Sequence, residues 1–141
     1  MGFDVLGDLN WLAVIVATIA YFALGALWFA DATLGKAWVR SMGWDRPADF
    51  RPGSAFYIGP FATCLIATIA VAMLAKATGS DTFAEGIVLG LVVGVGISAA
   101  VLFVTGVFDP KKAQPMTWFL IAGGYHLVGL LISSVVVSLW T

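Results

Sequence analysis

The chain has 141 residues, of which 61% are hydrophobic and only 11% are charged, and its formal net charge is −1. A soluble globular domain is usually about half apolar and roughly a quarter charged. This composition therefore argues against a soluble fold. We also expect no nucleic-acid partner, because basic residues do not outnumber acidic ones.

Four apolar stretches follow one another along the chain, and none contains Asp, Glu, Lys or Arg. They are residues 9–30, 55–75, 87–108 and 116–139. A helix needs roughly 20 apolar residues to cross the hydrocarbon core of a bilayer, and each stretch is long enough. Backbone polar groups in lipid must be paired within the segment, which favours helices. We predict an all-α fold, an integral membrane four-helix bundle formed by a single transmembrane domain, residues 1–141.

The basic residues are distributed unequally between the loops. All seven Lys and Arg residues except Lys76 lie in two loops, 31–54 and 109–115. Such residues are concentrated in cytoplasmic loops of membrane proteins. We therefore expect both loops in the cytoplasm and both termini on the extracytoplasmic side. The expected location is the cell membrane, with several passes, as in a bacterial inner membrane protein.

The 31–54 loop contains a segment with helical periodicity, "LGKAWVRSMG". Leu34, Trp38 and Met42 repeat every four residues, whereas Lys36 and Arg40 point elsewhere. This pattern predicts a short amphipathic interfacial helix whose Lys36 and Arg40 contact lipid headgroups. The alternative is a loop that only fixes the topology.

The chain has six tryptophans, and all lie at predicted span boundaries or in the 31–54 loop. Indole rings favour the interface between membrane and water. We expect interfacial anchors at Trp11, Trp28, Trp38, Trp118 and Trp140.

Small residues recur at helical spacing in the third and fourth spans. Gly86, Gly90 and Gly94 follow at intervals of four, in the direction of Ser98. Membrane helices associate through close backbone approach at such positions. We predict a helix-packing face made of Gly86, Gly90, Gly94, Gly123 and Gly129. Another span of the same chain and a second copy are both compatible partners.

The only histidine, His126, lies in the apolar run "IAGGYHLVGLL". Its helical neighbours are small residues, so the imidazole should point into the bundle. At similar depth lie the other members of a candidate intramembrane polar cluster, which are Tyr21, Thr63 or Cys64, Ser98 and Tyr125. Ionisable residues within a membrane are functional candidates by default. Three interpretations stay open: a structural hydrogen bond, part of a ligand or permeation site, and a pH-responsive group.

One histidine and one cysteine supply too few ligands for an ordinary metal site. The sequence also contains no Ser-His-acid set and no phosphate-binding glycine loop. We therefore expect no metal, no cofactor and no catalytic residues, and hence a protein that is not an enzyme.

Three segments together carry a family resemblance: "NWLAVIVATIAYFALGALWF", "LGKAWVRSMGW" and "WFLIAGGYHLVGLLISSVVVSLW". In this order they resemble the domain of unknown function 1761 (DUF1761) family of small bacterial and fungal polytopic membrane proteins. The resemblance covers nearly the whole chain. It implies the same membrane architecture, and it brings neither an activity nor site residues.

Two classes of function are compatible with the sequence. One is a non-enzymatic scaffold or accessory subunit that packs with itself, as a homo-oligomer, or with a larger membrane complex. The other is a small transporter or channel with a solute or proton path past Tyr21, Ser98 and His126. The short loops and the lack of charge within the spans favour the scaffold. A water-filled cavity that reaches His126 would reverse this order.

Overall fold

The computed structural model describes residues 2–140, and within this range the secondary structure is helical, without strands. The elements are η1 (Phe3–Asp8), α1 (Trp11–Trp28), α2 (Gly35–Met42), α3 (Ala55–Thr78), α4 (Phe83–Leu91), η2 (Val92–Ala99), α5 (Ala100–Val107) and α6 (Pro115–Leu139). η1 is a 3-10 helix and η2 is a π-helix. α4, η2 and α5 run on without a break and form one long helix, which we call the third span.

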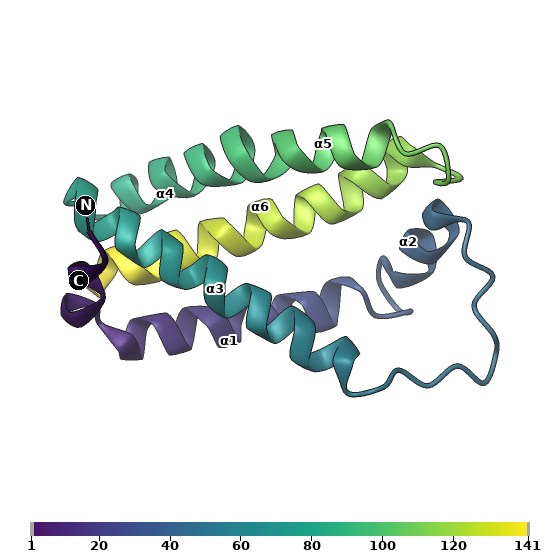
Figure 1. Ribbon diagram of the computed structural model, residues 1–141, viewed down its shortest axis with the longest axis horizontal. Helices are drawn as coiled ribbons and strands as arrows, with labels where there is room; N and C mark the ends of the chain where they lie inside the picture. Colours follow the sequence, from purple (N-terminus) through teal and green to yellow (C-terminus); the bar gives the residue numbers. More distant parts are fainter. Residues whose placement is uncertain (1, 141) are drawn as a thin grey trace.

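Four helices are long and apolar enough to cross a membrane, and they confirm the predicted fold class. They are Trp11–Trp28, Ala55–Thr78, Phe83–Val107 and Pro115–Leu139. Both chain ends lie at one end of the bundle, here called the terminal end, and α2 lies at the other, the α2 end (Figure 1). At the terminal end, the Asn10 side chain donates a hydrogen bond to the Trp140 carbonyl (2.7 Å). The membrane side of each end stays a prediction from charge.

Helix α6 is the centre of the bundle. It contacts α1, α3, α2 and all three parts of the third span, and Figure 1 shows it between α1 and the third span. Half of the most apolar 18-residue stretch of α6 is buried within the bundle, compared with 17% of the corresponding stretch of the third span. The third span therefore lies at the periphery and exposes most of its surface to the surroundings.

The glycines of the third span make its contact with α6 possible. A Cβ atom at Gly86 would lie 2.9 Å from Cα of Val135, and one at Gly90 would lie 2.9 Å from Cα of Leu131. These separations leave no room for a side chain, so the two backbones touch. Gly86 and Gly90 of the predicted face therefore pack against α6 within the chain in this structure.

The π-helix η2 changes the face on which the next residues lie. α-Helical spacing places Ser98 in line with Gly90 and Gly94, but hydrogen bonds from i to i+5 add backbone to each turn. Gly94 remains buried against Leu127, whereas Ser98 is only half-buried. The expected continuation of the stripe to Ser98, which assumed an unbroken α-helix, stays a prediction.

The predicted amphipathic helix in the first loop is α2. Gly43 ends it in the left-handed conformation (φ 70°), with its N–H bonded to the Arg40 carbonyl (3.0 Å). Lys36 and Arg40 are exposed, and their contacts with lipid headgroups stay a prediction. The Ser41 carbonyl accepts a hydrogen bond from the Gln114 N–H (2.9 Å), so α2 is attached to the turn before α6.

The five expected tryptophan anchors fall into two groups. Trp11 and Trp140 are 44% and 45% exposed at the terminal end, as interfacial side chains would be. Trp28, Trp38 and Trp118 are half-buried and form contacts within the chain. The Trp28 indole, for example, donates to the Ile121 carbonyl (3.0 Å). These three rings therefore contribute to packing near the α2 end.

Candidate functional site

A hydrogen bond between α1 and α6 defines the centre of the candidate site. The Tyr21 hydroxyl lies 2.5 Å from Nδ1 of His126. Either atom can be the donor in this hydrogen bond, because the roles of the two ring nitrogens depend on the tautomer of the imidazole. The Tyr21 ring fits because it lies against Gly129, where any Cβ atom would overlap the ring.

Tyr125 extends this centre towards α3. Its ring centroid is 5.3 Å from that of Tyr21 and 4.7 Å from that of His126. Its hydroxyl lies 3.4 Å from the Cys64 sulfur on α3. Gly25 leaves room for this hydroxyl, since a Cβ atom there would approach it to 2.9 Å. Three helices therefore meet at one group of side chains.

A large cavity lies next to this group, and residues of α2 and of the loop that follows it are among those that line it. We call it the α2 cavity; its volume is about 1010 Å³, and it lies between α1, α2, α3, α5 and α6. This volume is at the upper limit of about 1,000 Å³ that is typical of small-molecule sites. His126 and Tyr125 line it together with many aromatic side chains, among them Phe22, Phe29, Trp38, Phe56, Tyr57 and Trp118.

The cavity exists because two helices diverge. α3 packs on α1 and α6 and meets the third span mainly at α4, across the short 79–82 connection. Towards the α2 end, α3 and α5 separate (Figure 1). Within this part of α3, a Cβ atom at Gly59 would have no neighbouring atom within 4 Å, and Pro60 follows it. Both residues line the cavity.

The loop between α2 and α3 forms the outer wall of the α2 cavity. Aromatic rings of this loop and of the first turn of α3 contact one another in sequence: the Trp44 and Phe50 centroids are 5.0 Å apart, and those of Phe50 and Phe56 are 5.6 Å apart. In the sequence these rings recur every six residues, a signal that could have indicated a shared cluster. Aromatic rings therefore line the α2 cavity on the side of this loop as well as on the side of the helices.

An ion pair lies at the mouth of the cavity. A guanidinium nitrogen of Arg46 lies 2.8 and 2.7 Å from the two carboxylate oxygens of Asp31. The hydrogen bond from Arg46, helped by the charges of Arg46 and Lys36, holds the pKa of Asp31 below its ordinary value. Asp31 and Arg46 are the charged residues that line the cavity in the described part of the chain.

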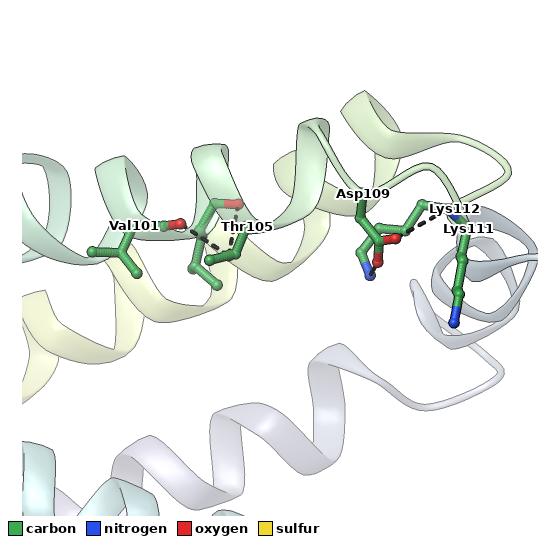
Figure 2. A network of polar contacts seen from close by, with 6 residues as sticks. Val101, Thr105, Asp109, Lys111 and Lys112 are labelled. Carbon is green, nitrogen blue, oxygen red and sulfur yellow. Dashed lines mark hydrogen bonds and ion pairs between the residues drawn. The ribbon is translucent and has the colours of Figure 1, made fainter.

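The turn between α5 and α6 fixes the opposite wall. Asp109 accepts hydrogen bonds from the Lys111 N–H (3.0 Å) and from the Lys112 ammonium (3.1 Å) (Figure 2). The Lys111 N–H is the main cause of a lowered pKa of Asp109, followed by Lys112. The same ammonium lies 4.4 Å from the centre of the Trp118 ring, a cation–π contact. Trp118 is thereby held where it lines the cavity.

The structure brings together only part of the predicted polar cluster. Tyr21, Tyr125 and His126 are in contact, with Cys64, not Thr63, as the α3 member. Thr63 lines the cavity, and its hydroxyl donates to the Pro60 carbonyl (2.9 Å). No hydrogen bond within residues 2–140 joins Ser98 to His126. In the same range, no group of three His, Cys, Asp or Glu side chains is arranged to hold a metal ion.

These features define a polytopic helical membrane protein with a large cavity at one end. Residues 12–138 match the family described as "Protein of unknown function (DUF1761)", and the chain belongs to this family. The resemblance of the three sequence segments is thereby confirmed. Comparisons with curated proteins and with solved structures find no match.

Proposed function

We propose that the protein is a small membrane transporter that takes a small amphipathic molecule into the α2 cavity. The observation that carries this proposal is the lining of the cavity, which includes His126 within the fourth span. A pocket of this size with aromatic walls and a few polar groups is the usual form of a small-molecule site. The proposal contains no chemical step, in keeping with the expectation that the protein is not an enzyme.

The glycine contacts also favour transport over the scaffold function. A scaffold that self-associates through the third span needs its small-residue face to be free. In this structure Gly86, Gly90 and Gly94 lie against α6 of the same chain. A scaffold or accessory subunit would have to use another surface, such as that around Gly96, where a Cβ atom would have no neighbour within 4 Å.

The bundle is closed between His126 and the terminal end. Ala17, Thr68 and Ser133 are fully buried there, and the Thr68 and Ser133 hydroxyls are 3.3 Å apart. A molecule can therefore enter from the α2 end, and passage to the other side requires α1, α3 and α6 to separate. This is the arrangement expected of one state in an alternating-access cycle.

Thiol labelling tests access to the cavity. In a Cys64→Ser background, Thr63→Cys places a thiol on the cavity wall, and Val101→Cys places one on the exposed face of the third span. We expect a membrane-impermeant maleimide, applied to vesicles of known orientation, to modify Thr63→Cys from the α2 side only. Val101→Cys should stay unmodified, because lipid covers it. Equal labelling of both, or no labelling of Thr63→Cys, would contradict the proposal.

A further inference from the structure

The orientation of His126 leaves one polar atom of its ring for an occupant. Nδ1 is used by Tyr21, and in the tautomer in which the Tyr21 hydroxyl is the donor, the imidazole carries its proton on Nε2. No hydrogen bond from Nε2 is present among residues 2–140, and the side chain lines the α2 cavity. A donor in apolar surroundings is costly unless it finds an acceptor. In this tautomer the imidazole can donate a hydrogen bond from Nε2 to a molecule in the α2 cavity.

The charges of the cavity indicate that the inner part of the occupant is neutral. Asp31 and Arg46 bind each other. They lie beyond the ends of α1 and α2, and Asp31 is more than about two helical turns past the level of Tyr21. An ionic group next to His126 would have no counter-ion from these residues. A neutral oxygen acceptor, such as a carbonyl, can accept a hydrogen bond from Nε2–H without the free-energy cost of burying an unpaired charge.

The walls indicate a flat apolar body. The Phe29 centroid is 5.1 Å from both the Tyr125 and the Trp38 centroids. Such tilted rings present faces and edges on which a planar ring system can stack. The volume of about 1010 Å³ leaves room for an apolar tail in addition to the ring.

We propose that the α2 cavity binds a neutral, lipid-soluble molecule of the quinone type, with one carbonyl oxygen accepting a hydrogen bond from Nε2 of His126. This inference rests on the proposed function, because it assumes that the cavity takes up a small molecule. His126 acts as a binding donor, and Tyr21 is a positioning residue that fixes the tautomer. No electron transfer is part of the proposal.

Two probes of the same shape test the carbonyl. The first is 2,3-dimethyl-1,4-naphthoquinone, whose substituted ring carbons disfavour addition of the Cys64 thiol. The second is 2,3-dimethylnaphthalene, which lacks both carbonyls. We expect equilibrium dialysis against the purified wild-type protein to show about tenfold tighter binding of the quinone, the effect of one hydrogen bond. Equal binding of the two probes, or binding of neither, would overturn the ligand class.

Variants of His126 test whether this residue causes the tighter binding of the quinone probe. His126→Phe should remove the preference for the quinone while keeping an aromatic ring, and His126→Gln should restore part of it through its amide N–H. A preference that survives in a folded His126→Phe protein would contradict the role of His126. The wild-type comparison decides the ligand class even if a variant does not fold. Labelling of Thr63→Cys distinguishes the two proposals: if it is modified and the probes bind equally, only the ligand class fails.

Discussion

The Tyr21 hydroxyl on α1 and the His126 imidazole on α6 are 2.5 Å apart although 105 positions separate them in the chain. Both side chains lie in apolar spans, where each would otherwise leave a polar group without a partner. The contact therefore fixes the register of α1 against α6. It also couples the tautomer of the imidazole, which lines the α2 cavity, to the direction of this hydrogen bond.

Removing the Tyr21 hydroxyl should destabilise the bundle slightly. Hydrogen bonds between membrane helices average about 0.6 kcal/mol and reach about 1.7 kcal/mol. We expect Tyr21→Phe to lower the free energy of unfolding by an amount in this range, measured by circular dichroism during titration with a denaturing detergent. Tyr57→Phe is the matched control, because Tyr57 is 56% exposed and its loss of a hydroxyl should have no measurable effect. An unchanged stability of Tyr21→Phe would show that the hydrogen bond does not contribute.

A methyl group at Gly129 should disrupt the same site by overpacking. Its Cβ would overlap the Tyr21 ring, which is 1% exposed and cannot move into open space. We expect Gly129→Ala to reduce the free energy of unfolding by about 1–3 kcal/mol. Gly96→Ala introduces the same methyl group where no atom lies within 4 Å, so its stability should stay close to that of the wild type. Similar losses in both variants would mean that helix–helix contact at Gly129 is not as close as described.

The ion pair at the cavity mouth should be insensitive to pH over the physiological range. Hydrogen bonding to Arg46 lowers the pKa of Asp31 below its ordinary value of 3.8. A carboxyl with a depressed pKa contributes its stabilisation above the unfolded pKa and loses it as the pH falls through the folded pKa. Hydrogen exchange of the loop 44–54 should therefore be alike at pH 7 and pH 5 after correction for the intrinsic rate, and should increase only in strong acid.

Asp31→Asn provides the complementary test of the same ion pair. It removes the carboxylate at every pH, so we expect faster exchange in the loop 44–54 already at pH 7. Asp49→Asn is a suitable control in the same loop, because Asp49 has no ion pair among the described residues. Faster exchange in wild type between pH 7 and pH 5, with no effect of Asp31→Asn, would contradict the assigned role.

The sequence predicts much of the fold because the physical signals are local. Long stretches without charge identify the four spans, and the spacing of Trp38 and Met42 identifies α2. The approach of Tyr21 to His126 also follows from depth and from the small residues around His126. Each of these inferences needs only helical geometry and the thickness of a bilayer.

Other features depend on tertiary packing and could not be read from the sequence. The π-helix η2 interrupts the α-helical geometry of the third span, and a pattern based on 3.6 residues per turn has no means to show this. The divergence of α3 from α5 creates the α2 cavity, although no residue spacing encodes it. The sequence predicts Trp38 and Trp118 as interfacial anchors, but it does not show that both also line the α2 cavity.

Nitrogen NMR of the imidazole tests the central claim most directly, because the chain has only one histidine and its signals need no assignment. In protein labelled with ¹⁵N-histidine, we expect a protonated Nε2 and an unprotonated Nδ1 that accepts a hydrogen bond, and the Nδ1 signal should change in Tyr21→Phe. Addition of 2,3-dimethyl-1,4-naphthoquinone should shift the Nε2 signal, whereas 2,3-dimethylnaphthalene should leave it in place. A proton on Nδ1, or an Nε2 signal that neither probe changes, would contradict the account of His126 as the donor in the α2 cavity.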